Sequence, residues 1–383
     1  MPRGRGLSDT GTESILEVLH NPYRGRGLPA TAEFAQGSVR CDPARGQALL
    51  ARCPIAAPTP LLDVPRLAAE LDVAQLHLKD ERDRMGLGSF KALGAGHVIA
   101  RMAADRLDRP GAPASADELA GALEGVVFAC ASAGNHGLSV AASAPAFGAT
   151  AVIYLSEAVS EDVADRLRAR GARVLRAGRD YDASMRAVAA DAQEQGWVLL
   201  SDSSWPGYVE VPAGVMEGYL AMGAEITDEL ERPATHVLLQ AGVGGLAAAM
   251  SALLRARWGQ QPVIVVVEPA AAPALLESIR AGRPVTAHGP ASSMGRLDCK
   301  EPSHLALGEL ARAADHFTTV DDDEAAATVD LLARHGITTS TSGAAGLAAL
   351  HHAGRHREAL GLDGNSRVLA IITEARPASG SGP

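Results

Sequence analysis

Residues 86–91, Gly-Leu-Gly-Ser-Phe-Lys, put a lysine directly after a glycine-rich turn, at the start of a helix predicted over Phe90–Ala104. A lysine at a helix start is most often only a solvated charge. The residues on either side of Lys91 are small or apolar, so we expect a protein-rich setting in which desolvation lowers the pKa of the amine. Such an amine can attack a carbonyl carbon and can carry a proton.

The turn at residues 132–137, Ser-Ala-Gly-Asn-His-Gly, follows a predicted buried strand, Val126–Cys130, and opens a predicted helix, Leu138–Pro145. In α/β proteins, ligands bind where the chain leaves the C-terminal end of a parallel strand, and the backbone N–H groups there can hold a carboxylate. The same turn could serve only as a helix cap. Its place between Lys91 and a second glycine-rich loop favours a binding role.

That glycine loop, residues 240–246 (Gln-Ala-Gly-Val-Gly-Gly-Leu), joins a predicted strand, His236–Gln240, to a predicted helix, Leu246–Trp258. Without Cβ atoms, successive N–H groups can point at one anion, and the dipole of the following helix adds attraction. The loop lacks the Gly-x-Gly-x-x-Gly spacing and the acidic partner of a dinucleotide site. The loop could serve only tight helix–sheet packing. Because the chain also contains the lysine turn and the asparagine turn, a phosphate-binding role explains the loop better.

A lysine that can form a Schiff base, an asparagine-bearing turn and a phosphate loop are the parts of a pyridoxal 5'-phosphate (PLP) site. In this order they resemble the fold-type II PLP enzymes, the group of threonine dehydratase and tryptophan synthase β. The patterns Lys-Asp-Glu, Arg-x-Gly-Leu and Ser-Phe-Lys-Ala-Leu-Gly within residues 79–94 are most similar to the diaminopropionate ammonia-lyases of that group. The resemblance runs from about Thr59 to Glu374.

The resemblance implies roles toward the cofactor. Lys91, preceded by Phe90, would hold PLP as a Schiff base and move the Cα proton, and Asn135 would donate to the phenolic oxygen. The phosphate would lie on the glycine loop, at Gly242, Val243, Gly244, Gly245 and Leu246. Thr373, rather than Ser342, would offer the pyridine nitrogen a neutral hydroxyl. A neutral partner leaves that nitrogen unprotonated, which favours β-elimination over transamination.

The resemblance also implies how the substrate is held. Its carboxylate would lie on Ser132, Ala133, Gly134 and His136. Asp202 begins an Asp-x-x-Trp pattern that this family assigns to the base for the L-substrate, although an aspartate beside serines could be only a turn cap. Ala133 stands where the family carries the aspartate assigned to the D-substrate, and Thr341 stands where it usually carries a glutamate. We therefore expect preference for L-amino acids, and a substrate choice altered by the neutral Thr341.

These residues predict a PLP-dependent lyase that eliminates a β-group from a small L-amino acid and gives a 2-oxo acid and ammonia. 2,3-Diaminopropionate heads the candidate substrates, followed by serine, threonine or another β-hydroxy amino acid. A β-replacement synthase is the alternative enzyme. A PLP-binding protein without catalysis is disfavoured, because it would not need Lys91 and Asp202 for proton transfer.

The elements that would position these residues alternate along the chain. Short, mostly β-branched apolar runs predict strands buried on both faces, at Leu76–Leu78, Val126–Cys130, Ala151–Leu155, Trp197–Ser201, His236–Gln240, Val263–Val267, Phe317–Val320 and Val368–Ile372. Helical patterns between them predict βαβ crossovers and a mostly parallel sheet. The resemblance implies an α/β, two-lobed, tryptophan synthase β-like fold with parallel twisted sheets flanked by helices. Its larger PLP-binding lobe would span 1–90 and 206–383, and its smaller substrate-side lobe 91–205.

The composition is that of a globular protein. The 383 residues are 47% hydrophobic and 21% charged, and a net charge of −10 without basic runs argues against nucleic acid as a partner. Four scattered cysteines predict no metal site and no disulfide, and no long apolar run predicts a membrane span. We expect a cytoplasmic homodimer. Arg106–Gly125 is predicted to be a surface connection, and the tail after Arg376 to be disordered.

Overall fold

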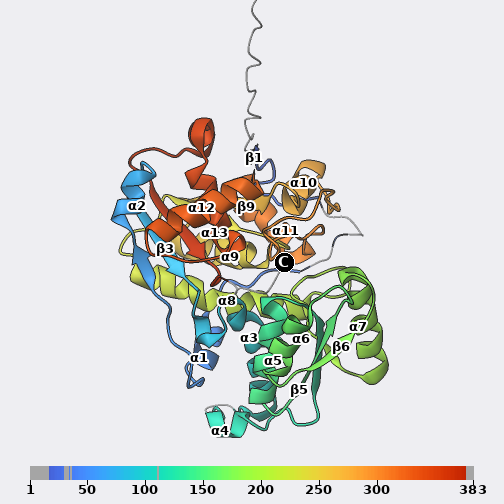
Figure 1. The fold of residues 1–383 in the computed structure, drawn as a ribbon. Helices are drawn as coiled ribbons and strands as arrows, with labels where there is room; N and C mark the ends of the chain where they lie inside the picture. Colours follow the sequence, from blue (N-terminus) through green and yellow to red (C-terminus); the bar gives the residue numbers. More distant parts are fainter. Residues whose placement is uncertain (1–16, 30–33, 35–36, 110–111, 377–383) are drawn as a thin grey trace, which may run out of the picture.

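The computed structural model describes residues 17–29, 34, 37–109 and 112–376. Its strands form two sheets (Figure 1). The larger has the order β1-β10-β9-β8-β11-β3-β2 and is built from Val18–His20 (β1), Leu61–Asp63 (β2), Gln75–Asp80 (β3), His236–Gln240 (β8), Val263–Pro269 (β9), His316–Val320 (β10) and Arg367–Ile372 (β11). The smaller has the order β6-β5-β4-β7 and is built from Val127–Ala131 (β4), Thr150–Leu155 (β5), Arg173–Arg176 (β6) and Val198–Leu199 (β7).

The inner strands of the larger sheet run parallel, and only the edge strands β1 and β2 pair antiparallel with their neighbours. Every residue of β8 is buried, as is every residue of β11 after the first, which explains why the middle of β8 and all of β11 after Arg367 are apolar. Strands β8 and β11 are adjacent and parallel, so the loop after Gln240 and the residues after Ile372 leave the sheet at the same edge.

The helices surround both sheets. They are α1 (Ala44–Leu50), α2 (Pro65–Glu70), α3 (Lys91–Leu107), α4 (Ala116–Leu119), α5 (Asn135–Ala146), α6 (Glu161–Arg168), α7 (Tyr181–Gln195), α8 (Glu210–Glu229), α9 (Gly245–Trp258), α10 (Ala274–Ala281), α11 (His304–Ala313), α12 (Asp322–Arg334), α13 (Thr341–His351) and α14 (Arg357–Leu360), with short 3-10 turns η1 (Arg84–Gly86) and η2 (Gly354–His356). Among the described residues, none of these helices combines the length and apolar character of a membrane span.

Helices α3 and α8 pack against each other in the region between the two sheets (Figure 1). Two glycines set how closely they approach. A Cβ on Gly218 would lie 2.3 Å from the backbone oxygen of Leu93, and a Cβ on Gly94 would lie 2.7 Å from the ring of Tyr219. No larger residue fits at either position, so the start of α3, where Lys91 lies, is held tightly against α8.

The predicted alternation of strands and helices is confirmed, and each predicted strand is present. The prediction missed β1, β2 and β6, which are only three or four residues long, and the long helix α8. Helix α8 is buried along most of its length, so it lacks the polar stripe by which a surface helix is recognised.

The predicted surface connection at Arg106–Gly125 is described except at residues 110 and 111. It contains α4, which begins with a capping box between Ser115 and Glu118, and it buries Leu119 and Leu123. The tail predicted to be disordered lies outside the described residues.

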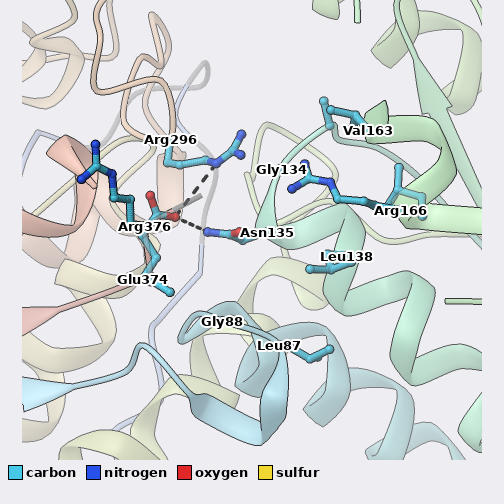
Figure 2. A pocket seen from close by; sticks show the side chains of 13 residues that line it. Leu87, Gly88, Gly134, Asn135, Leu138, Val163, Arg166, Arg296, Glu374 and Arg376 are labelled. Carbon is cyan, nitrogen blue, oxygen red and sulfur yellow. Dashed lines mark hydrogen bonds and ion pairs between the residues drawn. The ribbon is translucent and has the colours of Figure 1, made fainter. Parts of the chain in front are cut away.

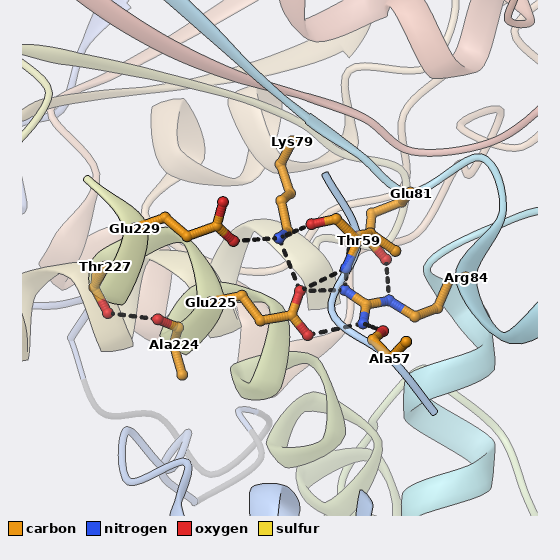
Figure 3. Close-up of polar contacts among 9 residues, drawn as sticks. All are labelled: Ala57, Thr59, Lys79, Glu81, Arg84, Ala224, Glu225, Thr227 and Glu229. Carbon is orange, nitrogen blue, oxygen red and sulfur yellow. Dashed lines mark hydrogen bonds and ion pairs between the residues drawn. The ribbon is translucent and has the colours of Figure 1, made fainter. Parts of the chain in front are cut away.

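A buried network of charges holds the segment that leads to Lys91 (Figure 3). Arg84, in η1, binds Glu81 at 2.6 Å and Glu225 of α8 at 2.7 Å. Lys79, fully buried in β3, binds Glu225 at 2.8 Å and donates to the backbone oxygen of Thr59 at 2.6 Å. The network therefore fixes the end of β3 and η1 to α8, in the segment that precedes Lys91.

Replacing Arg84 with methionine should lower the free energy of unfolding by about 3–5 kcal/mol, because the carboxylates of Glu81 and Glu225 would stay buried with one cation fewer. Chemical denaturation followed by circular dichroism measures this loss. The matched control is Arg168→Met, since Arg168 pairs with Glu161 and Asp165 on the exposed face of α6. That change should cost less than about 1 kcal/mol. Equal losses in the two variants would show that the buried network is not what stabilises this segment.

Candidate active site

Lys91 begins α3 and is held against the end of β11 by backbone hydrogen bonds. Phe90 N donates to Thr373 O at 3.1 Å, and Ala375 N donates to Gly88 O at 2.9 Å. The chain enters this arrangement through Gly88, whose φ of +79° favours glycine. The lysine expected from the sequence to be reactive is therefore fixed to the same sheet edge as Thr373.

The Lys91 side chain forms an ion pair with Asp202, which follows β7. Nζ donates to Oδ2 at 2.5 Å, and each side chain is about one-fifth exposed (21% each). This corrects the expectation that the pKa of Lys91 is lowered. Burial alone lowers it, but the charge and hydrogen bond of Asp202 outweigh burial and raise it above the usual range for lysine. Likewise Lys91 holds the pKa of Asp202 below its usual range, despite burial.

Two aromatic rings border the ion pair. Lys91 Nζ lies 5.3 Å from the ring centre of Phe90 and 5.8 Å from that of Tyr219, and the two rings pack edge to face. Burial raises the pKa of Tyr219 to about 12, so its hydroxyl is neutral at physiological pH. The rings keep one side of the Lys91–Asp202 pair away from water.

The turn at residues 132–137 is compact. Gly134 N donates to Ser132 Oγ at 3.2 Å, and a Cβ on Gly137 would lie 2.2 Å from Ser132 O. Helix α5 begins at Asn135, so its first N–H groups are available to an anion. The ring of His136 is buried, with Nε2 2.8 Å from Leu200 O, and its Nδ1 has no hydrogen-bond partner among the described residues.

Asn135 meets Glu374 across the site. Its Nδ2 donates to the Glu374 carboxylate, which also accepts from Ser340 Oγ and lies 4.0 Å from Arg296 Nε. Glu374 is only 4% exposed. These contacts border a pocket of about 180 Å³ between the turn that contains Ala133 and Gly134, helix α6 and the end of β11 (Figure 2).

The glycine loop at residues 240–246 lies beside this arrangement and is tightly enclosed at two of its glycines. A Cβ on Gly242 would lie 3.0 Å from Cys299 Sγ, and Gly244 has a φ of +99° with a Cβ position 3.0 Å from Ala306. A Cβ on Gly245 would lie 3.9 Å from Asp202 O, which places the loop next to the Lys91 partner. Val243 O accepts from Ser303 N at 2.9 Å, and Leu246 is buried in α9.

Three hydroxyls expected near the cofactor or substrate have different surroundings. Thr373 is 4% exposed, and its Oγ1 accepts from Gln240 Nε2 at 3.2 Å, so its own proton remains free to donate. Ser342 Oγ accepts from Arg296 N at 3.2 Å. Thr341 Oγ1 donates to Ser293 O at 2.9 Å and is not among the residues that line the pocket of Figure 2.

Sequence reasoning missed the roles of Tyr219, Arg296 and Glu374 in this geometry. Tyr219 lies in the unpredicted helix α8, and Arg296 lies in a loop without regular structure. Glu374 had a usable signal, since it directly follows an apolar strand and a charged residue there is either solvated or functional. Among the described residues, no group of three or more His, Cys, Asp or Glu side chains is placed to hold a metal ion.

Comparisons with known proteins agree with this geometry. Residues 53–374 match the family model described as pyridoxal-phosphate dependent enzyme. The diaminopropionate ammonia-lyase of Salmonella typhimurium is 32% identical, over 94% of this chain and 95% of that protein. Two crystal structures of the Escherichia coli diaminopropionate ammonia-lyase, one with an aminoacrylate-PLP azomethine reaction intermediate and one with D-serine, each superpose with a TM-score of 0.82 at 29% identity, covering 94% of both chains.

Proposed function

The chain belongs to the family of pyridoxal-phosphate dependent enzymes, and on this basis we propose that it eliminates a β-group from a small L-amino acid, giving a 2-oxo acid and ammonia. The similarity to diaminopropionate ammonia-lyases over nearly the whole chain supports this reaction, and 2,3-diaminopropionate is the first substrate to test. The observation that carries the proposal is the Lys91–Asp202 pair at 2.5 Å, beside a loop that is tightly enclosed at Gly242 and Gly244.

The residues of the site fit PLP. The glycine loop and the start of α9 leave backbone N–H groups free for a phosphate, since a Cβ at Gly242 or Gly244 would collide with its neighbours. Lys91 supplies the amine for the covalent bond and Asn135 a donor for the phenolic oxygen. Thr373, with its free hydroxyl proton, would meet the pyridine nitrogen, and Phe90 would border the cofactor. When bound, PLP withdraws electrons from the substrate Cα and makes its proton removable.

The remaining residues bind the substrate and move protons. The N–H groups at the start of α5, within the turn that contains Ser132, Ala133, Gly134 and His136, hold the α-carboxylate. Lys91 Nζ and Asp202 Oδ2 share a short hydrogen bond, so a proton taken from Cα can be held on one atom and returned from the other to the leaving group. Phe90 and Tyr219 limit the access of water to these atoms. Thr341 would act on substrate choice indirectly, through the loop that it binds at Ser293.

The test is an assay of the PLP-loaded protein with 2,3-diaminopropionate, L-serine and L-threonine, in which the 2-oxo acid and ammonia are both quantified. We expect pyruvate and two molecules of ammonia from each 2,3-diaminopropionate. If no amino acid yields a 2-oxo acid, the elimination reaction is refuted. The same assay with an added thiol separates elimination from β-replacement, because a synthase would form the thioether in place of the 2-oxo acid.

Replacing Gly244 with valine should weaken PLP binding on the order of a hundredfold or more. The valine would strain the backbone at a φ of +99° and displace the N–H groups that hold the phosphate, each worth about 1.5–3 kcal/mol. Equilibrium dialysis against PLP measures the affinity. Gly259→Val is the matched control, since Gly259 also has a positive φ but ends α9 at the far side from the loop. Unchanged affinity in Gly244→Val would contradict the phosphate cradle.

We also propose that the protein is a homodimer in the cytoplasm, as its resemblance to the fold-type II enzymes implies. Light scattering of the purified protein gives its mass in solution, and twice the chain mass of 39.4 kDa is the expected result.

A further inference from the structure

The side-chain amide of Gln240 is buried at the end of β8, one position before Ala241 and the glycines of the loop. The residue is only 1% exposed. Its Nε2 donates to the backbone oxygens of Ile371 at 3.0 Å and Gly343 at 3.1 Å, and to Thr373 Oγ1 at 3.2 Å. The amide therefore connects the strand that leads into the glycine loop with the strand end that carries Thr373.

The surroundings of this amide fix which way it faces. If the amide were rotated by half a turn, Oε1 would lie against the backbone oxygens of Ile371 and Gly343, which have no proton to give. In the observed orientation Oε1 has no hydrogen-bond partner among the described residues, and a Cβ on Gly346 of α13 would lie 2.6 Å from it. Because an unpartnered buried acceptor lowers stability, packing alone does not explain an amide at this position.

The amide nitrogen decides what the hydroxyl of Thr373 can do. An amide nitrogen carries two donor hydrogens and accepts no hydrogen bond, so Thr373 Oγ1 must be the acceptor in its contact with Gln240. The hydroxyl proton therefore points elsewhere, and among the described residues no group accepts it. Thr373 is 4% exposed, and a buried hydroxyl with an unused proton is prepared to donate to a ligand.

We propose that Gln240 is a positioning residue that keeps the hydroxyl of Thr373 a donor toward the pyridine nitrogen of PLP. The proposal rests on the proposed function, since it deepens the role that Thr373 has there. A donor hydroxyl meets the unprotonated form of that nitrogen, whereas a protonated nitrogen would need an acceptor. Gln240 thus acts on electron withdrawal by the cofactor through Thr373, and it favours β-elimination over transamination.

The test compares the affinity of the PLP-free protein for PLP and for the deaza analogue of PLP, in which a C–H group replaces the ring nitrogen. Equilibrium dialysis gives both dissociation constants and needs no substrate. We expect the unaltered protein to bind PLP about five- to a hundredfold more tightly than the analogue, the range for a buried donor left without an acceptor. Gln240→Met should lose most of this preference, because the Thr373 hydroxyl would no longer accept the bond that fixes its direction.

Asn21→Leu is the matched control, because it also removes a buried amide far from the glycine loop. Asn21 is 1% exposed, and its Nδ2 donates to three backbone oxygens, those of Leu310, Ala311 and Ala314. The control should lose stability as Gln240→Met does but keep the preference for PLP over the analogue. If both variants lost the preference alike, the effect would be one of general destabilisation and the proposal would be wrong.

A double-mutant cycle with Thr373→Val separates positioning from packing. In that background Gln240→Met should leave the remaining preference unchanged, because the hydroxyl through which Gln240 acts is gone. A further loss of preference there would show that Gln240 acts by another route and would contradict the proposal.

The protonation state of the ring nitrogen is a second readout that needs no variant. PLP labelled with nitrogen-15 in the ring and bound to the unaltered protein should give the NMR resonance of an unprotonated, hydrogen-bonded nitrogen. The resonance of a protonated nitrogen would overturn the proposal, as would equal affinity for PLP and the deaza analogue. Turnover of an amino acid without this preference would refute the role of Gln240 alone. The preference without elimination from any amino acid would refute the proposed reaction alone.

Discussion

Replacing Lys91 with alanine should abolish the covalent attachment of PLP and reduce turnover to background. Lys91 is one of only three lysines in the chain. Lys79 is fully buried and bound to Glu225, and Lys300 is paired with Asp298 at 2.7 Å and donates to two backbone oxygens. Neither can take the place of Lys91, so the effect should be complete.

Borohydride reduction of the PLP-loaded protein, followed by peptide mapping, measures the attachment. The unaltered protein should carry the label on the peptide that contains Lys91, and Lys91→Ala should carry none. Lys300→Ala is the matched control and should keep the full label. A label on Lys79 or Lys300 in the unaltered protein would refute the assignment of the reactive lysine.

Replacing Asp202 with asparagine should lower kcat by about 10²- to 10⁴-fold while PLP stays bound, because a general base contributes on this order. Asparagine keeps the shape of the side chain but cannot accept a proton from Lys91 Nζ across the 2.5 Å contact. The loss of the neighbouring negative charge should also lower the pKa of Lys91, which Asp202 holds above its usual range. The pH dependence of the rate at which the PLP-free variant forms its Schiff base with added PLP measures that change without relying on turnover.

Turnover rates measured on both enantiomers of one substrate complete this test. Ala133 offers no proton acceptor on the turn that opens α5, so we expect strong preference for the L-enantiomer. Asp182→Asn, an exposed change in the first turn of α7, is the control and should leave both rates unchanged. Equal rates on L- and D-serine would refute the stereochemical assignment. A loss of less than tenfold in Asp202→Asn would show that Lys91 takes the Cα proton unaided.

The parts of the site that the sequence predicted are those formed by contiguous residues. The lysine turn, the asparagine turn and the glycine loop are each only six or seven residues long, and the last two follow apolar strands that are easy to recognise. The glycine loop and Thr373 could be expected to lie together, since the parallel strands β8 and β11 deliver their C-terminal ends to one edge, whereas the asparagine turn follows β4 of the other sheet.

The parts that failed depend on contacts between distant residues. The pKa of Lys91 was predicted in the wrong direction because its neighbours in sequence are apolar, whereas Asp202, which decides the shift, lies 111 residues away. Glu374 meets Asn135 and Arg296 only through the fold; its place after an apolar strand was a usable signal, but no local pattern marks Arg296. The lobe boundaries at residues 90/91 and 205/206 stay a prediction, although β4 to β7 all lie between residues 127 and 199.

Temperature acts on the buried charges around Arg84 differently from the way it acts on the apolar core. The cost of removing charged groups from water falls as temperature rises, because their hydration is entropically unfavourable, while the gain from burying apolar surface levels off. The contacts from Arg84 and Lys79 to Glu225 should therefore contribute relatively more to stability in warm solution than in cold. On heating, the chain from β3 to Lys91 should be among the last parts to loosen, so the reactive lysine would keep its position while apolar regions elsewhere begin to open.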